Sequence, residues 1–213
     1  MARTPSFDRE AVVRAARTLF WTVGYESASI PDLEAATGLS RSSIYNAFGS
    51  KRGLFDAAVQ SYLDEIVRPR LRPLSGEVVD PDAVIAYLQG LRDAFGTLTS
   101  MPASHGCLLV NAAGAPIAHD PKVAQVISDY RAELHDAFAR GVDARTPDLD
   151  AAERERRVTA ITSSVVAAFA LARIDPAEAG RGITLAIELV ARGGPSVLTN
   201  STSHPSHVHR SPR

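Results

Sequence analysis

The spacing of apolar residues is the feature that most constrains the fold of this chain. Nearly every patterned stretch repeats its apolar residues three or four positions apart, and almost none alternates with the period of two that a half-buried strand requires. Asp80, Asp120 and Asp175 each stand before a proline and a stripe of this kind, and an aspartate followed by proline is a typical helix start. The pattern therefore predicts an all-α protein with helix N-termini at these three aspartates.

Composition narrows the class of protein further. The 213 residues are 45% hydrophobic, which allows one large domain or two small ones that share a core. The formal charge of -1 excludes a basic coat over the whole surface, and the single cysteine excludes an intrachain disulfide framework and fits a reducing cytoplasm. The longest uncharged apolar run, residues 160–172, is too short to span a bilayer, and residues 1–8 hold no secretory signal. We therefore expect a cytoplasmic protein with no membrane partner.

Two short helices joined by a glycine are predicted between residues 29 and 48. Ser29 can cap the first helix, whose buried side is expected to hold Ile30, Leu33 and Ala36. Gly38 permits a sharp turn, and Ser40 can cap a second helix that runs to about Phe48. Such a pair forms a helix-turn-helix.

The second helix of this pair has a composition suited to a DNA groove. Only Ile44 and Phe48 are strongly apolar, so the polar side chains are left to face outward, without bulk or negative charge. Lys51, at the start of the next helix, is placed to contact a phosphate. Residues 1–55 carry a net charge of +2, from seven basic and five acidic side chains, which leaves -3 for the rest. The side chains expected to bind DNA are Ser29, Arg41, Ser42, Ser43, Tyr45, Asn46 and Lys51.

Residues 16–55 resemble the TetR family of bacterial transcriptional regulators. The residues that match the family pattern are Ala16, Leu19-Phe20, Gly24-Tyr25, Ile30, Leu33, Ala36, Gly38-Leu39-Ser40, Ile44-Tyr45, Phe48, Ser50-Lys51 and Leu54-Phe55. Glu34 and Gly53 depart from the pattern, and we expect neither to touch the DNA-facing side. The resemblance implies a homodimer that places two recognition helices on a palindromic double-stranded operator, and a repressor that a small-molecule effector releases.

The same resemblance, together with composition, divides the chain into three parts. We expect a DNA-binding domain over residues 1–50, an effector-binding and dimerisation domain over 51–195, and a disordered tail over 196–213 that is rich in Ser, His and Pro. Candidate residues of the effector pocket are Tyr62, Tyr87, Phe95, His105, Cys107, Asn111, Tyr130 and Phe138. The run of small residues from 160 to 172 is expected to lie in the dimer interface, whose apolar centre would be formed by Ile161, Val165, Phe169 and Ile187.

The junction between the first two parts carries two further expectations. Phe20 and Trp21 are predicted to pack the first helix against the helix-turn-helix. The proline-rich segment from Arg68 to Pro73 is predicted to stop the helix before it, because an internal proline breaks the hydrogen-bond ladder.

Cys107 leaves two interpretations open. It lies in a Gly-Cys-Leu-Leu-Val-Asn segment, residues 106–111, that one subgroup of the family shares. A free cysteine is commonly a small buried hydrophobe. Alternatively, a stabilised thiolate would make the protein an electrophile- or oxidant-sensing repressor.

Catalytic and metal chemistry find little support in the sequence. It contains no Gly-x-Ser-x-Gly elbow, no phosphate-binding glycine loop and no dinucleotide fingerprint, so we expect no enzyme and no cofactor. His204, His207 and His209 lie in the predicted tail and match no metal-binding pattern, so no metal site is expected.

Overall fold

The computed structural model describes residues 7–97 and 100–192, and every regular element within these ranges is helical. The prediction of an all-α protein is confirmed. The elements are α1 (Arg9–Val23), α2 (Ile30–Thr37), α3 (Arg41–Phe48), α4 (Lys51–Tyr62), the π-helical turn η1 (Leu63–Val67), α5 (Arg68–Leu71), the 3-10 turn η2 (Arg72–Leu74), α6 (Ala83–Gly96), α7 (Met101–His105), α8 (Leu108–Ala113), the 3-10 turn η3 (Pro116–His119), α9 (Pro121–Arg145), α10 (Ala151–Leu171) and α11 (Pro176–Ala191).

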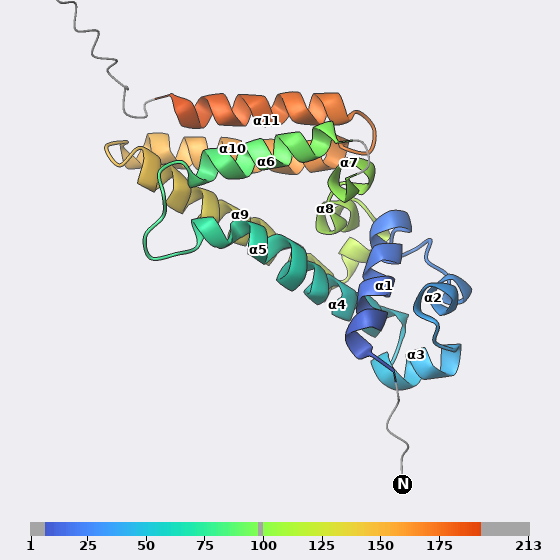
Figure 1. Ribbon diagram of the computed structural model, residues 1–213. Helices are drawn as coiled ribbons and strands as arrows, with labels where there is room; N and C mark the ends of the chain where they lie inside the picture. The colour runs from blue at the N-terminus through green and yellow to red at the C-terminus, as the bar shows by residue number, and fades with distance from the viewer. Residues whose placement is uncertain (1–6, 98–99, 193–213) are drawn as a thin grey trace, which may run out of the picture.

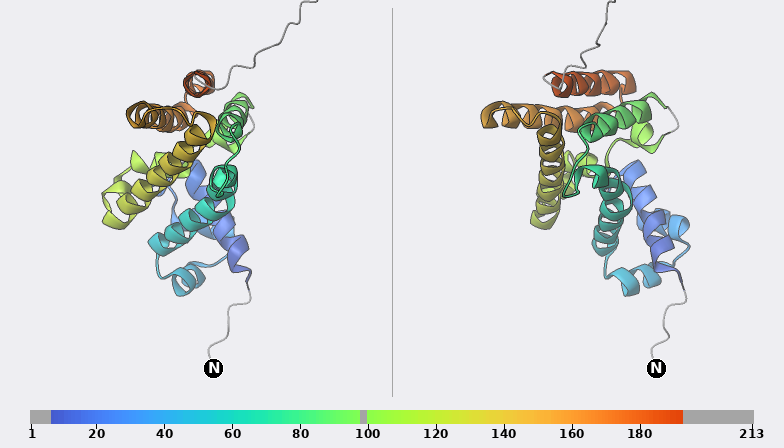
Figure 2. Two further views of the ribbon diagram at one scale, coloured as in Figure 1. Left: turned by 90° about the vertical axis from the view of Figure 1, so that its left-hand side faces the viewer. Right: turned by 60° about the vertical axis from the view of Figure 1, so that its left-hand side comes forward.

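The helices are arranged between two ends of the molecule. Helices α1, α2 and α3 gather at one end, and α6, α10 and α11 pack side by side at the other (Figure 1). The path from α4 through α5, together with the long helix α9, spans the distance between them, as the turned views also show (Figure 2). One continuous cluster of buried apolar residues runs from Ala16 in α1 to Val190 in α11.

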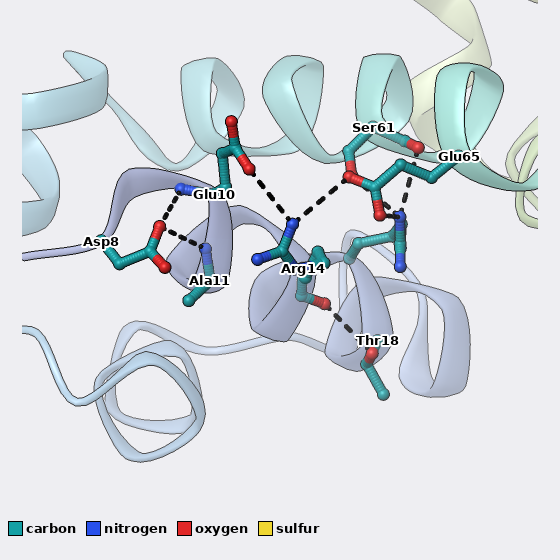
Figure 3. Close-up of polar contacts among 8 residues, drawn as sticks. Asp8, Glu10, Ala11, Arg14, Thr18, Ser61 and Glu65 are labelled. Carbon is teal, nitrogen blue, oxygen red and sulfur yellow. Dashed lines mark hydrogen bonds and ion pairs between the residues drawn. The ribbon is translucent and has the colours of Figure 1, made fainter.

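Helix α1 is fixed to α4 and η1 by buried rings and by charged side chains. The ring of Phe20 meets that of Phe55 edge-on, with 5.2 Å between the ring centroids. On the exposed side, the Arg17 guanidinium lies 2.9 Å from the Glu65 carboxylate and 2.8 Å from the Ser61 hydroxyl. Arg14 reaches the same carboxylate at 3.8 Å (Figure 3). These contacts hold α1 against α4 and η1.

The proline-rich segment does not stop the preceding helix, so that prediction was wrong. The chain continues from α4 through η1, where the Arg68 amide donates to the Leu63 carbonyl, and Pro69 falls in the first turn of α5. A wider turn directly before a proline leaves room for the ring, which would otherwise clash with the carbonyl four residues earlier. The helical path ends only at Leu74.

Two of the three predicted Asp-Pro helix starts are confirmed. The carboxylates of Asp120 and Asp175 accept hydrogen bonds from backbone amides in the first turns of α9 and α11. Asp80 is different, because it accepts from the amide of Asp82 in a turn, and α6 begins at Ala83. An aspartate before proline also favours turns, which is the alternative that prevails here. The predicted tail lies outside the described residues.

Gly53 is required by close packing at the start of α4. A Cβ atom at this position would lie 2.0 Å from the Phe48 carbonyl oxygen, so a side chain would have to displace the end of α3. We expect Gly53→Ala to lower the free energy of unfolding by about 1–3 kcal/mol. Gly90→Ala is the matched control, because an added Cβ there meets no atom within 4 Å and alanine favours a helix by up to about 1 kcal/mol.

Urea denaturation followed by circular dichroism measures both variants. A Gly53→Ala protein as stable as the parent would contradict this account of the α3–α4 junction.

Candidate nucleic-acid interface and internal cavity

The predicted helix-turn-helix is formed by α2 and α3. Ser29 and Asp32 make a reciprocal capping box at the start of α2, and Gly38 ends that helix in the left-handed conformation at φ 70°. Ser40 then caps α3, accepting from the Ser43 amide. One detail differs from expectation: Ala36 is exposed, and the buried side of α2 is centred on Leu33.

One face of α3 is open to solvent. Ile44 is fully buried against the neighbouring helices, which turns Arg41, Ser42, Tyr45 and Asn46 outward. The Arg41 guanidinium lies over the Tyr45 ring, 5.6 Å from its centroid, so these two side chains share a surface. The exposed side of this helix combines a cation, hydroxyls and an amide, which are the groups that read base edges and phosphates.

Ser43 and Ser29, although predicted to bind DNA, are engaged within the fold. Ser43 is half-buried and its hydroxyl lies 3.0 Å from that of Ser40. The Ser29 hydroxyl donates to the Asp32 carboxylate at 2.5 Å, and this contact lowers the pKa of that carboxyl group. Both serines therefore serve first as parts of helix caps.

Two residues that the sequence analysis did not select brace the ends of α3. The Glu34 carboxylate accepts from the Arg41 amide at 2.5 Å, and the Arg9 guanidinium donates to the Ala47 carbonyl at 3.0 Å while lying over the Phe48 ring. An acid at the N-terminus and a base at the C-terminus both complement the helix dipole. Glu34 thus contacts the backbone at the start of α3, a contact that the sequence analysis did not predict.

The spacing of Glu34, seven residues before Arg41 across a glycine turn, is a local signal that could have revealed its contact. Arg9 offers no such signal, because it is 38 residues away from Ala47 in the sequence.

Lys51 lies beside the turn after α1. Its ammonium group is 4.5 Å from the centroid of the Tyr25 ring and 3.4 Å from the Glu26 carbonyl oxygen. Partial burial lowers the pKa of this lysine, while the negative charge of Glu26 opposes the shift. The predicted phosphate contact would therefore have to compete with contacts that Lys51 already makes.

The N-terminal helices are joined to the rest of the molecule by specific polar contacts. Trp21 is buried, and its indole Nε1 donates to the Gly106 carbonyl at 3.1 Å. This side chain therefore packs toward the segment between α7 and α8, whereas the sequence had predicted that it packs against the helix-turn-helix. Arg52 reaches Asp120, the cap of α9, at 2.5 Å. The Glu26 carboxylate accepts from the Ile117 amide in η3 at 2.7 Å.

Gly106 is needed at the tryptophan contact for a steric reason. Its backbone has φ 66°, and a Cβ there would lie 2.6 Å from the Phe169 carbonyl oxygen. Only a glycine allows the chain to pass this close to α10 while presenting its carbonyl to Trp21.

A cavity of about 350 Å³ lies where Trp21 meets the body. Its lining comes from α1, from the path between α4 and η2, and from α6, α7 and α10, and it is open to solvent on one side. Of the eight predicted pocket residues, only Tyr62 and Tyr87 line it. The other lining residues are Trp21, Pro69, Arg70, Pro73, Ala86, Gly90, Leu91, Ala94, Pro102 and Phe169.

The remaining predicted pocket residues serve the core or its connections. Phe95 and Phe138 are fully buried among other apolar side chains. Asn111 donates to the His105 carbonyl at 2.7 Å and so ties α8 to the end of α7. Sequence periodicity identified these residues as inward-facing, but it does not distinguish a filled core from the wall of a cavity.

Cys107 is completely buried, and its sulfur lies 3.4 Å from the Tyr130 hydroxyl. Burial is the main cause that raises the pKa of Tyr62 and of Tyr130, and the nearby thiol raises both further. The thiol thus lies beside a tyrosine hydroxyl group in the core.

The residues predicted for the centre of the dimer interface point inward. Ile161 and Val165 are fully buried in their own subunit, Phe169 lines the cavity, and Ile187 is half-buried. Of the four, only Ile187 therefore has part of its side chain exposed on one subunit. The exposed residues of α10 and α11 include Ser163, Ala167, Ala170, Leu171 and Leu185.

Within residues 7–97 and 100–192, no three His, Cys, Asp or Glu side chains gather in a way that could hold a metal ion. The three histidines of the tail lie outside these ranges. None of the helices in the described part of the chain combines the length and the apolar character that a bilayer crossing requires.

The sequence matches the family model for bacterial regulatory proteins of the TetR family over residues 12–58, which cover α1 to α4. A similar protein is the HTH-type transcriptional regulator YezE of Bacillus subtilis (strain 168), which is 32% identical over 149 residues, or 67% of this chain and 72% of YezE. The HTH-type transcriptional repressor ComR of Escherichia coli (strain K12) is 34% identical over 110 residues, or 51% of each chain.

Solved structures agree with this match over nearly the whole chain. A cysteine mutant of the TetR family transcriptional regulator CifR, in complex with double-strand operator DNA, has a TM-score of 0.69 and 30% identity, and the match covers 89% of this chain and 99% of CifR. A TetR transcriptional regulator from Chloroflexus aurantiacus has a TM-score of 0.66 and 30% identity over 86% and 92% of the two chains. This protein therefore belongs to the TetR family of bacterial transcriptional regulators.

Proposed function

We propose that this regulator is a ligand-responsive repressor that binds operator DNA through α3 and is released when a small molecule enters the cavity beside Trp21. The observation that carries this proposal is the exposed polar face of α3, which is capped and braced at both ends. The operator complex of CifR, at 30% identity, supports the same role for this chain.

Helix α4 connects the proposed DNA-binding helix α3 to the cavity, so a movement of α4 would change both. Its first residue, Lys51, follows the recognition helix after a two-residue turn, and its last residue, Tyr62, lines the cavity. The π-helical turn η1 comes next, and such turns often occur at functional sites. A ligand that binds better to one position of α4 than to another would shift the population of DNA-binding orientations.

The position of α4 also marks the boundary between two proposed domains. We propose residues 1–50 as the DNA-binding domain and residues 51–195 as the effector and dimerisation domain, with α4 as the shared boundary helix.

A homodimer would form through the outer sides of α10 and α11. Residues 158–171 of α10 carry no charge even where they are exposed, and Leu185 on α11 is 52% exposed. Exposed uncharged faces of this kind are typical of interaction surfaces.

Substitution of Arg41 tests the DNA contact. We expect Arg41→Ala to weaken binding to the promoter of its own operon by about 1–3 kcal/mol per half-site, because an arginine can donate two hydrogen bonds to one guanine. Arg131→Ala, an exposed arginine on α9, should leave the affinity unchanged. Fluorescence anisotropy at several salt concentrations measures both. If the parent protein shows no salt-dependent preference for any sequence, the proposal fails.

Substitution of Ala167 tests the dimer. It is exposed on α10, so glutamate there should cost a monomer little, within about 0.5 kcal/mol, but should separate two packed helices. We expect Ala167→Glu to sediment as a monomer in analytical ultracentrifugation, and Ala124→Glu on α9 to remain dimeric. Two variants that sediment alike as dimers would place the interface elsewhere.

The alternative of thiol sensing through Cys107 has a direct test. Because the thiol is buried and adjoins hydroxyl groups, we expect hydrogen peroxide to leave the DNA affinity of the parent protein unchanged over minutes. The measurement is the same anisotropy titration before and after treatment. Loss of binding in the parent protein, together with retention in Cys107→Ser, would instead establish the sensing role.

A further inference from the structure

The cavity beside Trp21 has an apolar wall and one charged group. Aromatic rings and aliphatic carbons form most of the lining, and Tyr62 and Tyr87 add two hydroxyl groups. Arg70 is the only charged residue among the lining side chains, and none of them is acidic. The volume of the cavity, about 350 Å³, falls at the lower end of the range for small-molecule sites.

Arg70 is exposed and, like Arg72 but unlike Arg68 and Arg17, makes no ion pair within the described residues. Arg68 pairs with Asp64 and Glu133, and Arg17 pairs with Glu65. No ion pair within the described residues includes Arg70, whose guanidinium donates to the Ile66 carbonyl at 3.2 Å. A guanidinium carries five N–H donors, so most of its capacity is available to a ligand.

Arg70 lines the same cavity as Tyr62 and Tyr87. Burial is the main cause that raises the pKa of both Tyr62 and Tyr87, and the Arg70 guanidinium opposes this rise at each hydroxyl. The cation and the two hydroxyl groups therefore act on the same space from α4, α5 and α6.

We propose that the ligand of this cavity is a small apolar molecule that carries one anionic group, such as a carboxylate, with the anion held by Arg70 and the apolar body against Trp21 and Phe169. This inference rests on the proposed function only in taking the cavity as the effector site. A carboxylate would supply the partner that Arg70 lacks, through charge-assisted hydrogen bonds that a neutral ligand cannot match.

An aromatic wall also suits a cationic ligand, because a cation is attracted to the face of a ring. Arg70 argues against that class, since its fixed positive charge would repel a second cation and no lining carboxylate offsets it. A neutral apolar ligand would leave the guanidinium to water and to the Ile66 carbonyl, and would gain nothing from its charge. The anion is therefore the class that the whole lining favours.

Three probes of one chain length separate these classes: octanoate, octanamide and octylamine. Trp21 is the only tryptophan in the sequence and lines the cavity, so its fluorescence reports occupancy, and calorimetry gives an independent Kd. We expect octanoate to bind at least about tenfold more tightly than octanamide, and octylamine to bind most weakly. Phenylbutyrate and its amide repeat the comparison with an aromatic body.

Variants of two neighbouring arginines show whether the preference for octanoate over octanamide depends on Arg70. Arg70→Gln should remove the advantage of octanoate while binding octanamide as the parent protein does, which also reports that the cavity is intact. Arg72→Gln, two residues away and outside the lining, should keep the advantage. Arg70→Lys should retain part of it, because the charge remains without the planar donor pair.

Two results would overturn the inference: an acid that binds no more tightly than its amide in both series, or a preference that survives in Arg70→Gln. Anisotropy with DNA separates this from the proposed function. If acids bind in a way that depends on Arg70 but leave the DNA affinity unchanged, the ligand class is supported. The proposal that a ligand in this cavity controls DNA binding is then refuted. Release of DNA by neutral probes, equal in the parent protein and Arg70→Gln, refutes the ligand class alone.

Discussion

The packing of α1 against α4 is the interaction on which the rest of the structure depends. Phe20 and Phe55 meet edge-on near the recognition helix, and Trp21 and Tyr62 do the same, at 5.0 Å between ring centroids, beside the cavity. The same pair of helices thus has one aromatic contact below α3 and another beside the cavity. Buried aromatic pairs have little freedom to slide, so a displacement at one contact must be transmitted or resisted at the other.

The recognition helix shows how eight residues hold a defined conformation. A helix of this length is not stable alone in water, because the nucleation of its first turn is not repaid by enough hydrogen bonds. Here Ser40 caps its start, Ile44 anchors its buried side, and Glu34 and Arg9 act on opposite ends of its dipole. The outward face is therefore held in one conformation by contacts within the protein, which would lower the entropic cost of binding DNA in the proposed way.

Specific polar contacts join the N-terminal helices to the rest of the molecule, and one continuous apolar core runs through both parts. Arg52 with Asp120, and Glu26 with the Ile117 amide, connect the N-terminal helices to the start of α9. Trp21 connects them to Gly106 at the cavity wall. A contact set of this kind can be rearranged at modest cost, while the buried core stays packed, which is what a switch between two orientations needs.

Local patterns in the sequence were sufficient for the features that depend on neighbouring residues. The helical class, the caps at Ser29 and Ser40, the turn at Gly38 and the outward face around Arg41 all follow from spacing over a few positions, because capping and amphipathicity are local effects. The family resemblance rested on these same residues, and the comparisons confirmed it.

Tertiary structure alone decided which inward-facing residues line the cavity and which fill the core. Tyr62 and Phe95 have the same helical periodicity in the sequence, yet only Tyr62 borders the cavity. The bracing of α3 by Arg9, the contact of Trp21 with Gly106 and the burial of Ile161 likewise join or cover residues far apart in the chain. Periodicity fixes the direction in which a side chain leaves its own helix, but what it meets depends on how the other helices pack.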